Sequence, residues 1–430
     1  MKKVLIITYY WPPSGGAGVQ RWLKFVKYLP EFDILPWVVT VDPVYAWYPQ
    51  RDLSLEKDIS PEVKVFKTRS FEFLKIISRI FGSRKVAYGG FTNVDKKNPL
   101  QVILRFIRGN FFIPDARVGW SSHAFRQARK LIIDNGIDTV ITTGPPHSAH
   151  LTGLKLKKEL NIRWIADFRD PWTDIFYYSD MLHTPVARKL DLRKEKKVLN
   201  SADRIIAVNN TVGKLLARKI DGKDHGRMTI ITNGYDEDDF SFTMAQEKEF
   251  VITYSGIISG SYKPEVFFRA FSDLVRNHPE ITFKFRLAGN LSPDIEREIR
   301  KFGLNDIFEY HGYISHHELV KLLKSSTALL YVFPEAVNYS GTSGKLFEYL
   351  AAGRPIIAVD APGSDASAII DECEAGKSFA RNDPEGIRNY LEQLVEAYKN
   401  PGEVKSGNGS YAEYSRRNLT AKLTRLIAEL

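Results

Sequence analysis

The sequence predicts an α/β protein in which two open parallel sheets face a common cleft. Short apolar runs rich in β-branched and aromatic residues alternate with longer helical patterns along nearly the whole chain, which is typical of parallel sheets covered by helices. The length of 430 residues exceeds one ordinary hydrophobic core. The alternation breaks over 234–250, where acids cluster, and then restarts. We therefore expect an N-terminal domain over 1–233, a linker over 234–250 and a second domain over 251–405. We expect a final helix within 406–430. One possibility for this helix is that it crosses back to the N-terminal domain.

In the first domain each expected strand is a short apolar run bounded by turn residues, and each expected helix has apolar positions three and four apart. The strands fall at 4–8, 37–41, 63–68, 139–143, 164–168, 204–208 and 228–232. The helices fall at 19–28, 122–135, 147–160, 187–201 and 211–220.

In the second domain the same reasoning predicts strands at 251–255, 281–288, 307–310, 328–333 and 355–359. Helices are expected at 264–277, 293–302, 316–324 and within 341–355, with a final amphipathic helix over 411–430. Ligands of such sheets bind at the carboxyl ends of the strands, so the loops there are the places to search for chemistry.

The composition is that of a soluble globular protein, with 43% hydrophobic and 12% aromatic residues. Cys373 is the single cysteine, which fits a reducing cytoplasm. The apolar N-terminal run is too short for a signal peptide, and no stretch approaches the roughly 18 apolar residues of a membrane span. We expect a cytoplasmic protein, either free or peripheral on the inner face of the plasma membrane.

The segment 341–355 is the most informative part of the chain. Thr342, Ser343 and Gly344 lie in a small-residue loop that opens a helix, and the free N–H groups of a helix start attract anions. Lys345 and Glu348 are three residues apart and share one face of that helix. A cation and a carboxylate so placed suit a ligand with phosphates and a sugar ring, such as a nucleotide-sugar. An ordinary surface helix with a Lys345–Glu348 ion pair is the alternative.

A glycine-rich turn follows the first strand. Gly15 and Gly16 let the backbone approach a substrate or diphosphate closely. The turn is not the spaced G-x-G-x-x-G of dinucleotide-binding folds, and the acid expected about 20 residues later is missing, so we disfavour a dehydrogenase. A tight turn without a ligand is the alternative.

Two further loops follow predicted strands in the first domain. His147 would hydrogen-bond a sugar hydroxyl or hold an acceptor, with packing or capping as the alternative and His150 as the competing residue. In the next loop two carboxylates flank an arginine beside a tryptophan that would stack on a sugar, and an ion-pair cluster that fixes the loop is the alternative. The acceptor-side residues are Asp167, Arg169, Asp170 and Trp172.

In the second domain, Gly256 ends a strand and leads to Lys263, which we expect at a helix start where it would neutralise a diphosphate. Asp236 and Asp238 formally match a metal-binding Asp-x-Asp, but they lie in the expected linker and are interpreted as a solvated turn. We therefore expect no metal site and no cofactor other than the co-substrate.

Taken together in this order and spacing, these residues resemble the GT-B glycosyltransferases, in particular the retaining family 4 of bacterial sugar transferases. The resemblance covers nearly the whole chain. It is carried by 15–16, 145–148, 167–172, 202–208, 232–236, 254–256, 312–316 and 343–355. It implies two Rossmann-like domains, with a nucleotide-diphospho-sugar held mainly by the second and the acceptor by the first.

The resemblance also implies individual roles. A glutamate at the position of Glu348 binds the nucleotide ribose, a lysine like Lys263 contacts the diphosphate, and His147 is the histidine of the cleft. The donor-binding set is Gly15, Gly16, Gly256, Ser340, Thr342, Ser343, Gly344, Lys345 and Glu348.

The chain departs from the family pattern at two positions. Ser340 stands where the family usually has a second glutamate, which leaves the donor-sugar contacts open. Ile258 stands where an arginine is usual, so Lys345 or Arg286 would have to supply the missing cation. A subgroup of the family carries Ser-x-Lys-x-x-Glu, so activity is still expected.

The net charge of +10 is concentrated over 73–108, where eight basic residues face one acid with aromatics between them. One interpretation is a solvated helical pair, and the other is contact with an anionic membrane surface. No recognition motif for nucleic acid accompanies the charge, so no nucleic-acid partner is expected.

The function expected from the resemblance is transfer of a sugar from a nucleotide-diphospho-sugar to a glycan or lipid-linked acceptor in cell-surface polysaccharide synthesis. It would be retaining and metal-independent, with the leaving diphosphate stabilised by lysines and helix starts. The alternatives are a nucleotide-sugar epimerase, an inverting GT-B enzyme and a non-catalytic nucleotide-binding protein of this fold.

Overall fold

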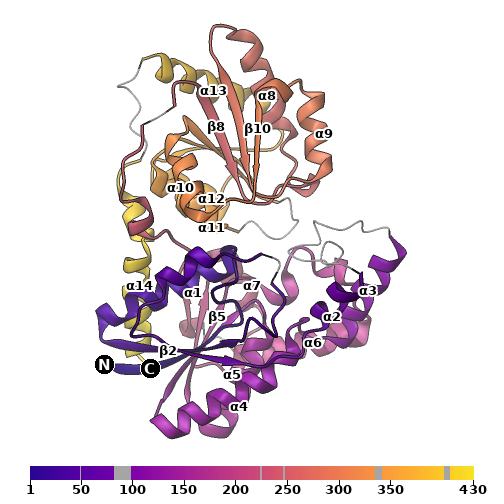
Figure 1. Ribbon diagram of the computed structural model, residues 1–430, viewed down its shortest axis with the longest axis vertical. Helices are drawn as coiled ribbons and strands as arrows, with labels where there is room; N and C mark the ends of the chain where they lie inside the picture. The colour runs from indigo at the N-terminus through magenta and orange to yellow at the C-terminus, as the bar shows by residue number, and fades with distance from the viewer. Residues whose placement is uncertain (49, 82–97, 223–224, 246, 335–340, 401–406) are drawn as a thin grey trace. The chain divides into compact units, whose positions relative to one another are not determined.

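The computed structural model describes residues 1–48, 50–81, 98–222, 225–245, 247–334, 341–400 and 407–430 (Figure 1). The chain forms two compact units. The first contains Met1–Thr232 and Leu419–Leu430, and the second contains Asn233–Asn418. No helix within these described ranges is long and apolar enough to cross a membrane.

The first unit is built on a parallel sheet whose seven described strands run in the order β3-β2-β1-β4-β5-β6-β7. They are β1 (Lys2–Ile7), β2 (Ile34–Val41), β3 (Lys64–Thr68), β4 (Thr139–Gly144), β5 (Arg163–Phe168), β6 (Arg204–Ala207) and β7 (Met228–Ile230). The strand order reverses between β1 and β4. A reversal of this kind opens a crevice at the carboxyl ends of the strands, where ligands bind.

Helices cover both faces of this sheet (Figure 1). The described α-helices of this part of the chain are α1 (Ala17–Tyr28), α2 (Phe73–Phe81), α3 (Pro99–Phe111), α4 (Val118–Asn135), α5 (Ser148–Leu160), α6 (Pro185–Ser201), α7 (Asn210–Ala217) and α14 (Arg416–Ala428). Among them, α2 and α3 contribute to a small separate apolar cluster and not to the core under the sheet. Val4 and Ile6 of β1 face α1 and the buried residues of α14 in one core. Gly153 of α5 touches Trp164 on the opposite face, so α5 covers the other side.

The second unit has a parallel sheet of six described strands in the order β10-β9-β8-β11-β12-β13. They are β8 (Phe250–Ser255), β9 (Phe283–Ala288), β10 (Phe308–Gly312), β11 (Ala328–Val332), β12 (Ile356–Val359) and β13 (Gly376–Phe379). Its order reverses between β8 and β11. The loops after these two strands therefore flank the expected crevice.

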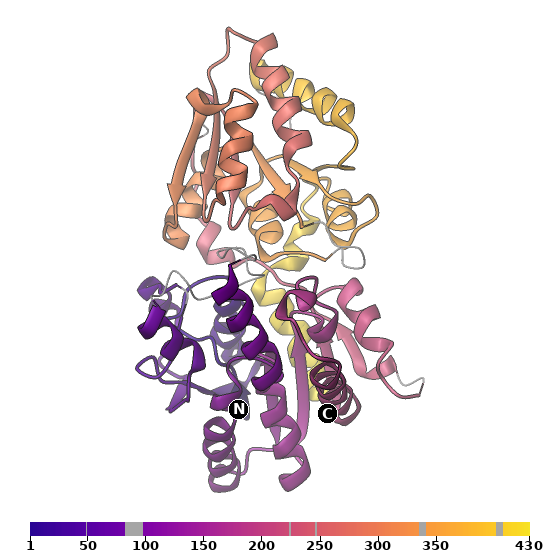
Figure 2. The same ribbon diagram turned by 90° about the vertical axis from the view of Figure 1, so that its right-hand side faces the viewer.

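Six α-helices lie wholly within the described residues of the second unit, which Figure 2 shows from another side. They are α8 (Glu265–Asn277), α9 (Pro293–Lys301), α10 (His316–Ser325), α11 (Gly344–Ala352), α12 (Asp365–Glu372) and α13 (Pro384–Lys399). Phenylalanines of α8 and leucines of α13 pack on one face of the sheet in an aromatic-rich core.

Every strand expected from the sequence is present, with ends that differ by a few residues, and the sequence analysis left out α12, β13 and α13. The stretch expected as a linker is grouped with the second unit and contains the short helix η8 (Glu237–Phe240). The final helix begins at Arg416 rather than at 411, after the short helix η11 (Ser410–Tyr414).

The described parts of the basic segment 73–108 differ from the interpretation as a solvated helical pair. The middle of the segment, 82–97, lies outside the described residues. In α3 the side chain of Arg105 is buried, and its guanidinium donates to the carbonyl oxygen of Asp180 at 3.2 Å. Ile103 and Phe106 are instead exposed at 56% and 42%. On α3, Ile103 and Phe106 therefore face outward, whereas Leu104 and this arginine face inward.

Candidate functional site

Lys345 occupies a tyrosine-lined position beside the end of β8. Its ammonium group donates to the Tyr254 hydroxyl at 2.6 Å and lies 4.1 Å from the centre of the Tyr254 ring. Burial lowers the pKa of Lys345 to about 7, while nearby Glu348 opposes this shift. No ion pair joins Lys345 to Glu348, and α11 buries Leu346, Phe347 and others, so the alternative of a surface helix with an ion pair is wrong.

Gly256 leaves the space that Lys345 fills. Gly256 has φ +97°, and a Cβ built on it would lie 3.4 Å from the Lys345 ammonium nitrogen. A larger residue here would be strained and would press on the lysine. The predicted donor-side glycine and lysine are therefore in contact.

Two further tyrosines fix the backbone around the start of α11. The Tyr349 hydroxyl accepts the Ser255 N–H at 2.8 Å, and the Tyr331 hydroxyl accepts the Ser343 N–H at 3.3 Å. Ser343 makes no side-chain cap hydrogen bond, and its buried hydroxyl has no partner among the described residues. The first turn of α11 therefore presents N–H groups and a hydroxyl to an anion.

The neighbouring loop residues leave the helix start accessible. A Cβ built on Gly344 would meet no atom of the described residues within 4 Å, so none of them fills the space beside the first turn of α11. Thr342 is buried at 5% exposure beside it. Ser340, the remaining predicted donor contact, lies outside the described residues.

Glu348 lies one turn further along α11 and remains 20% exposed. One of its oxygens, Oε1, lies 3.7 Å from Nδ1 of His316, and Nε2 of His316 lies 3.2 Å from Oδ2 of Asp239. Burial raises the pKa of Glu348, and His316 opposes that rise. No role was predicted for His316 or Asp239, because their proximity to Glu348 depends on how η8, α10 and α11 pack.

Lys263 is exposed and ends the short helix η9 (Gly260–Tyr262) with φ +49°, two residues before α8 begins. It therefore precedes the helix start at which it was expected. The ring of Tyr262, its neighbour, lies 5.8 Å from the Lys345 ammonium group.

Ile258, where the family usually has arginine, is fully buried in the apolar core. Arg286 pairs with Glu247 and Glu309, so it is already neutralised and is not the cation expected near the diphosphate.

In the first unit the glycine-rich loop lies between β1 and α1. The Gly15 N–H donates to the carbonyl oxygen of Gln50 at 3.1 Å, and Gly16 has φ +87°. Ser14 Oγ and Trp11 Nε1 are buried and have no hydrogen-bond partner within the described residues. The loop thus follows β1 directly, at the strand-order reversal of its sheet.

Asp167 is a structural carboxylate rather than an open acceptor contact. It accepts from the guanidinium of Arg21 at 2.8 Å, from the Trp22 indole at 2.7 Å and from the Thr143 hydroxyl at 2.8 Å, and it is fully buried. Burial opposes ionisation, but Arg21 and these donors hold the pKa of Asp167 below its usual value. Asp167 was expected to pair with Arg169, but its ion-pair partner is Arg21.

Arg169 connects two loops at the carboxyl edge of the first sheet. Its guanidinium donates to the carbonyl oxygens of Gly18, Gly144 and Pro145, the last two within the loop that carries His147. Asp170 is half-buried, has no hydrogen bond or ion pair within the described residues, and has its pKa raised by burial. Of the two predicted acceptor-side carboxylates, only Asp170 is available to a ligand.

His147 and Trp172 are stacked on each other, with ring centres 4.7 Å apart and planes 9° apart. Trp172 is 2% exposed and its indole donates to Asp191 at 2.9 Å, so it supports His147 and does not offer a ring face for a sugar, contrary to our expectation. Burial holds the pKa of His147 well below its usual value, so the imidazole is neutral. His150 is fully buried against Thr142, and His147 is the more accessible of the two at 8% exposure.

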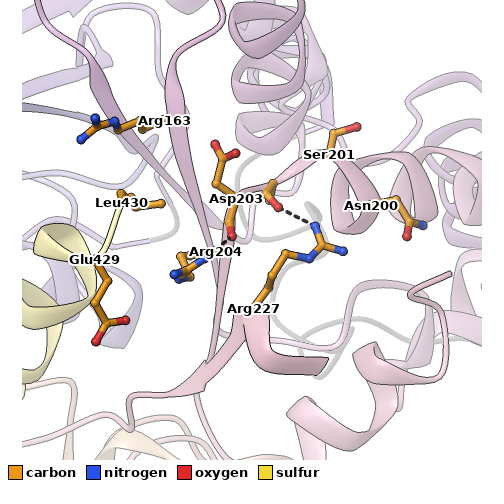
Figure 3. Close-up of a pocket in the computed structure, with 9 residues that line it drawn as sticks. Arg163, Asn200, Ser201, Asp203, Arg204, Arg227, Glu429 and Leu430 are labelled. Carbon is orange, nitrogen blue, oxygen red and sulfur yellow. Dashed lines mark hydrogen bonds between the residues drawn. The ribbon is translucent and has the colours of Figure 1, made fainter. Parts of the chain in front are cut away.

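A pocket of about 400 Å³ lies elsewhere in the first unit, at the amino ends of β5, β6 and β7 (Figure 3). Arg227 donates to the carbonyl oxygen of Ala202 there at 2.8 Å. Figure 3 marks this hydrogen bond of Arg227 by a dashed line. None of the predicted site residues lines this pocket.

Asp236, in the second unit, caps η8 and is 3% exposed, so it does not lie in the solvated turn that we expected.

Two regions of the chain match models of glycosyltransferase families. Residues 86–239 match Glycosyltransferase Family 4, and residues 249–397 match Glycosyl transferases group 1. Among curated proteins, probable glycosyltransferase WbjE from Pseudomonas aeruginosa is 23% identical over 273 residues. That match covers 60% of this chain and 66% of WbjE, so it spans just under two thirds of the relative's length.

Solved structures share the whole architecture. Sucrose-phosphate synthase from Thermosynechococcus elongatus has a TM-score of 0.65 at 14% identity, covering 100% of this chain and 99% of that one. HepE from Anabaena, solved in complex with UDP, has a TM-score of 0.63 at 12% identity, with both chains covered completely. Two Rossmann-like units of this kind define the GT-B class of proteins. With the family matches, the chain is a GT-B protein built from two regions that match glycosyltransferase family models.

Proposed function

We propose that the protein is a glycosyltransferase that moves a sugar from a nucleotide-diphospho-sugar to a glycan or lipid-linked acceptor in cell-surface polysaccharide synthesis. The arrangement of α11 carries the proposal. Its accessible first turn, the Lys345 ammonium group beside it and the Glu348 carboxylate one turn on match, in order, a diphosphate followed by a ribose.

In this proposal the charge of the leaving diphosphate is stabilised by the second unit. Lys345 and Lys263 supply cations, and the N–H groups at the start of α11 supply aligned dipoles. Glu348 accepts hydrogen bonds from the ribose hydroxyls. The catalytic set is then His147, Lys263 and Glu348, and we expect no metal to be required.

The first unit would bind the acceptor through His147 and Asp170. A neutral imidazole can accept from or donate to a hydroxyl, and the unpaired Asp170 carboxylate can orient a second one. No described side chain in this region is placed as a covalent nucleophile, which favours attack of the acceptor from the face that the diphosphate leaves. The leaving phosphate would then take the acceptor proton, and the anomeric configuration would be retained.

The test begins with a thermal-shift screen of UDP-, GDP-, ADP- and CDP-sugars, followed by transfer assays with the donor that stabilises the protein. Glu348→Gln and Lys263→Met should each lower the transfer rate at subsaturating donor by about tenfold, as expected for a lost hydrogen bond to a charged group. Glu396→Gln and Lys301→Met, at exposed sites of the same unit, are the matched controls. Wild-type rates in both site variants would refute the assignment.

Two additional measurements test the mechanism. Proton NMR of the product should show the anomeric configuration of the donor, and an inverted product would contradict retention. Transfer should persist in EDTA, whereas a loss of activity that Mg²⁺ restores would contradict metal independence.

We also propose that the protein contacts an anionic membrane surface through α3. Ile103 and Phe106 are exposed on this helix, and Phe111 at its end is 74% exposed. Exposed apolar side chains on a helix suit insertion at a lipid interface, and the basic composition of the sequence over 73–108 suits an anionic surface such as the inner face of the plasma membrane. Co-sedimentation with vesicles containing phosphatidylglycerol should exceed that with phosphatidylcholine alone and should fall in Ile103→Ser/Phe106→Ser. Equal binding to both vesicles would remove the proposal.

A further inference from the structure

His316 lies between two carboxylates in the second unit. Its Nε2 is 3.2 Å from Oδ2 of Asp239, a hydrogen-bonding distance, and its Nδ1 is 3.7 Å from Oε1 of Glu348, an ion-pair distance. The three side chains are only 17% to 23% exposed and come from α10, η8 and α11, respectively. One imidazole thus connects three separate elements.

The helix starts determine where this imidazole lies. Ser315 and Glu318 form a capping box in which the Ser315 hydroxyl accepts the Glu318 N–H at 3.3 Å and Glu318 accepts the Ser315 N–H at 3.2 Å. His316 is the first residue of the helix so fixed. The Asp236 side chain caps the start of η8 by accepting the Asp238 N–H. This cap fixes the short helix that carries Asp239. The ring is therefore oriented by backbone that does not depend on a ligand.

The proton count explains why the arrangement constrains Glu348. A neutral imidazole has one N–H, so it can donate to only one of two carboxylates, and its other nitrogen would repel the second. Both contacts are favourable only when the imidazole carries two protons or one carboxyl group is protonated. The charged groups that act on Glu348 are His316, Asp239, Arg416 and Lys345. Of these, His316 lies within ion-pair distance of Glu348.

We propose that His316, anchored by Asp239, is a positioning residue that orients the Glu348 carboxylate toward the ribose hydroxyls of the donor. This inference depends on the proposed function, because it takes Glu348 as the ribose contact. Without the imidazole, Glu348 would be free to turn on its three side-chain torsions, and its hydrogen bonds to the ribose would be weakened.

The test compares a ribonucleoside diphosphate with its 2′-deoxy counterpart by isothermal titration calorimetry, beginning with UDP and dUDP and continuing with the GDP and ADP pairs if UDP does not bind. Wild type should prefer the ribonucleotide. His316→Ala should weaken ribonucleotide binding by about tenfold and leave deoxynucleotide binding within about twofold, because only the ribose contact is lost. A general distortion of the site would weaken both ligands equally.

Conservative variants make the experiment specific. The amide nitrogen of His316→Asn lies near the Nδ1 position and should keep most of the preference for ribose, whereas the amide of His316→Gln lies near Nε2 and should lose most of it. His317→Ala, at the exposed next residue of the same helix, is the matched control and should behave as wild type. Equal loss of both ligands in His316→Ala, or no loss, would overturn the proposal.

The Glu348→Gln variant separates this inference from the proposed function. If wild type discriminates between the two ligands and Glu348→Gln abolishes the discrimination, the ribose assignment holds and only the role of His316 remains in question. If Glu348→Gln keeps full discrimination, or wild type binds none of the nucleotides, both the ribose assignment and the positioning role are wrong.

Discussion

At the scale of single residues, Lys345 shows how burial prepares a cation for an anionic ligand. Its ammonium group donates a hydrogen bond to Tyr254 and lies against aromatic rings. Burial destabilises the charged form, and no carboxylate lies within ion-pair distance among the described residues to compensate. A diphosphate would supply the missing negative charge. Lys345 is therefore charged most readily when the ligand is present.

This property predicts a pH dependence of nucleotide binding. The pKa of Lys345 is about 7 in the free protein, and a bound diphosphate would raise it. Above pH 7 binding must therefore take up a proton, and the affinity for UDP or the nucleotide that binds should fall by up to about tenfold per pH unit. Calorimetry from about pH 6 to about pH 9 measures it. Lys345→Met should bind more weakly and lose the slope between pH 7 and 9, and an unchanged slope would contradict the role of Lys345.

The first unit contains the opposite case. Asp167 was predicted as an acceptor contact because it follows a strand beside arginine and tryptophan. In the structure its lone pairs are occupied by Arg21, Trp22 and Thr143. Arg21 and Trp22 are 145 or more positions away in sequence, so no local pattern could have paired them with Asp167. The neighbouring Asp170 makes no such contacts and remains a candidate acceptor contact.

At the scale of elements, the loop after β4 depends on a glycine. A Cβ built on Gly144 would lie 2.6 Å from Nε2 of His150 and 2.7 Å from Nδ1 of His147, closer than real Cβ contacts allow. Arg169 holds the same loop through its carbonyl oxygens. Glycine, arginine and the stacked Trp172 together determine where the His147 ring lies.

Gly144→Ala should therefore displace both imidazoles. We expect a loss of about 1–3 kcal/mol in the free energy of unfolding, as for other overpacked sites, and at least a tenfold lower turnover at saturating donor, to order of magnitude. Nucleotide affinity, assigned to the second unit, should not change. Gly136→Ala is the control, because its added Cβ meets no described atom within 4 Å and costs only about 1–2 kcal/mol through its left-handed backbone. Normal turnover in Gly144→Ala would remove His147 from the proposed catalytic set.

At the scale of the whole molecule, the chain returns to its first unit at its end. Leu419, Leu423, Leu426 and Ile427 of α14 are buried in the core that also holds β1 and α1. A sequence pattern can show that such a helix is amphipathic, but not which core it joins. The first unit is therefore completed by residues that follow the entire second unit in sequence.

Leu423→Ala tests this contribution. Leu423 is fully buried, so its truncation should lower the stability of the first unit by about 2–5 kcal/mol. Hydrogen exchange followed by mass spectrometry should show lost protection in β1 and β4 and unchanged protection in β8 and β11. Arg425→Ala, exposed on the same helix, is the control. Lost protection confined to 233–418 would contradict this assignment.

The sequence by itself determined the class of architecture, the order of the elements and the loops that hold the candidate site. Hydrophobic periodicity and glycine placement are local properties, so the expected strands were found, together with the helix of Lys345 and Glu348. Only the tertiary structure decided which polar side chains are already occupied and which are available. It paired Asp167 with Arg21, placed His316 between Asp239 and Glu348, and turned Arg105 inward while Phe106 faces outward. These outcomes depend on contacts between residues far apart in the chain, which no spacing along the sequence encodes.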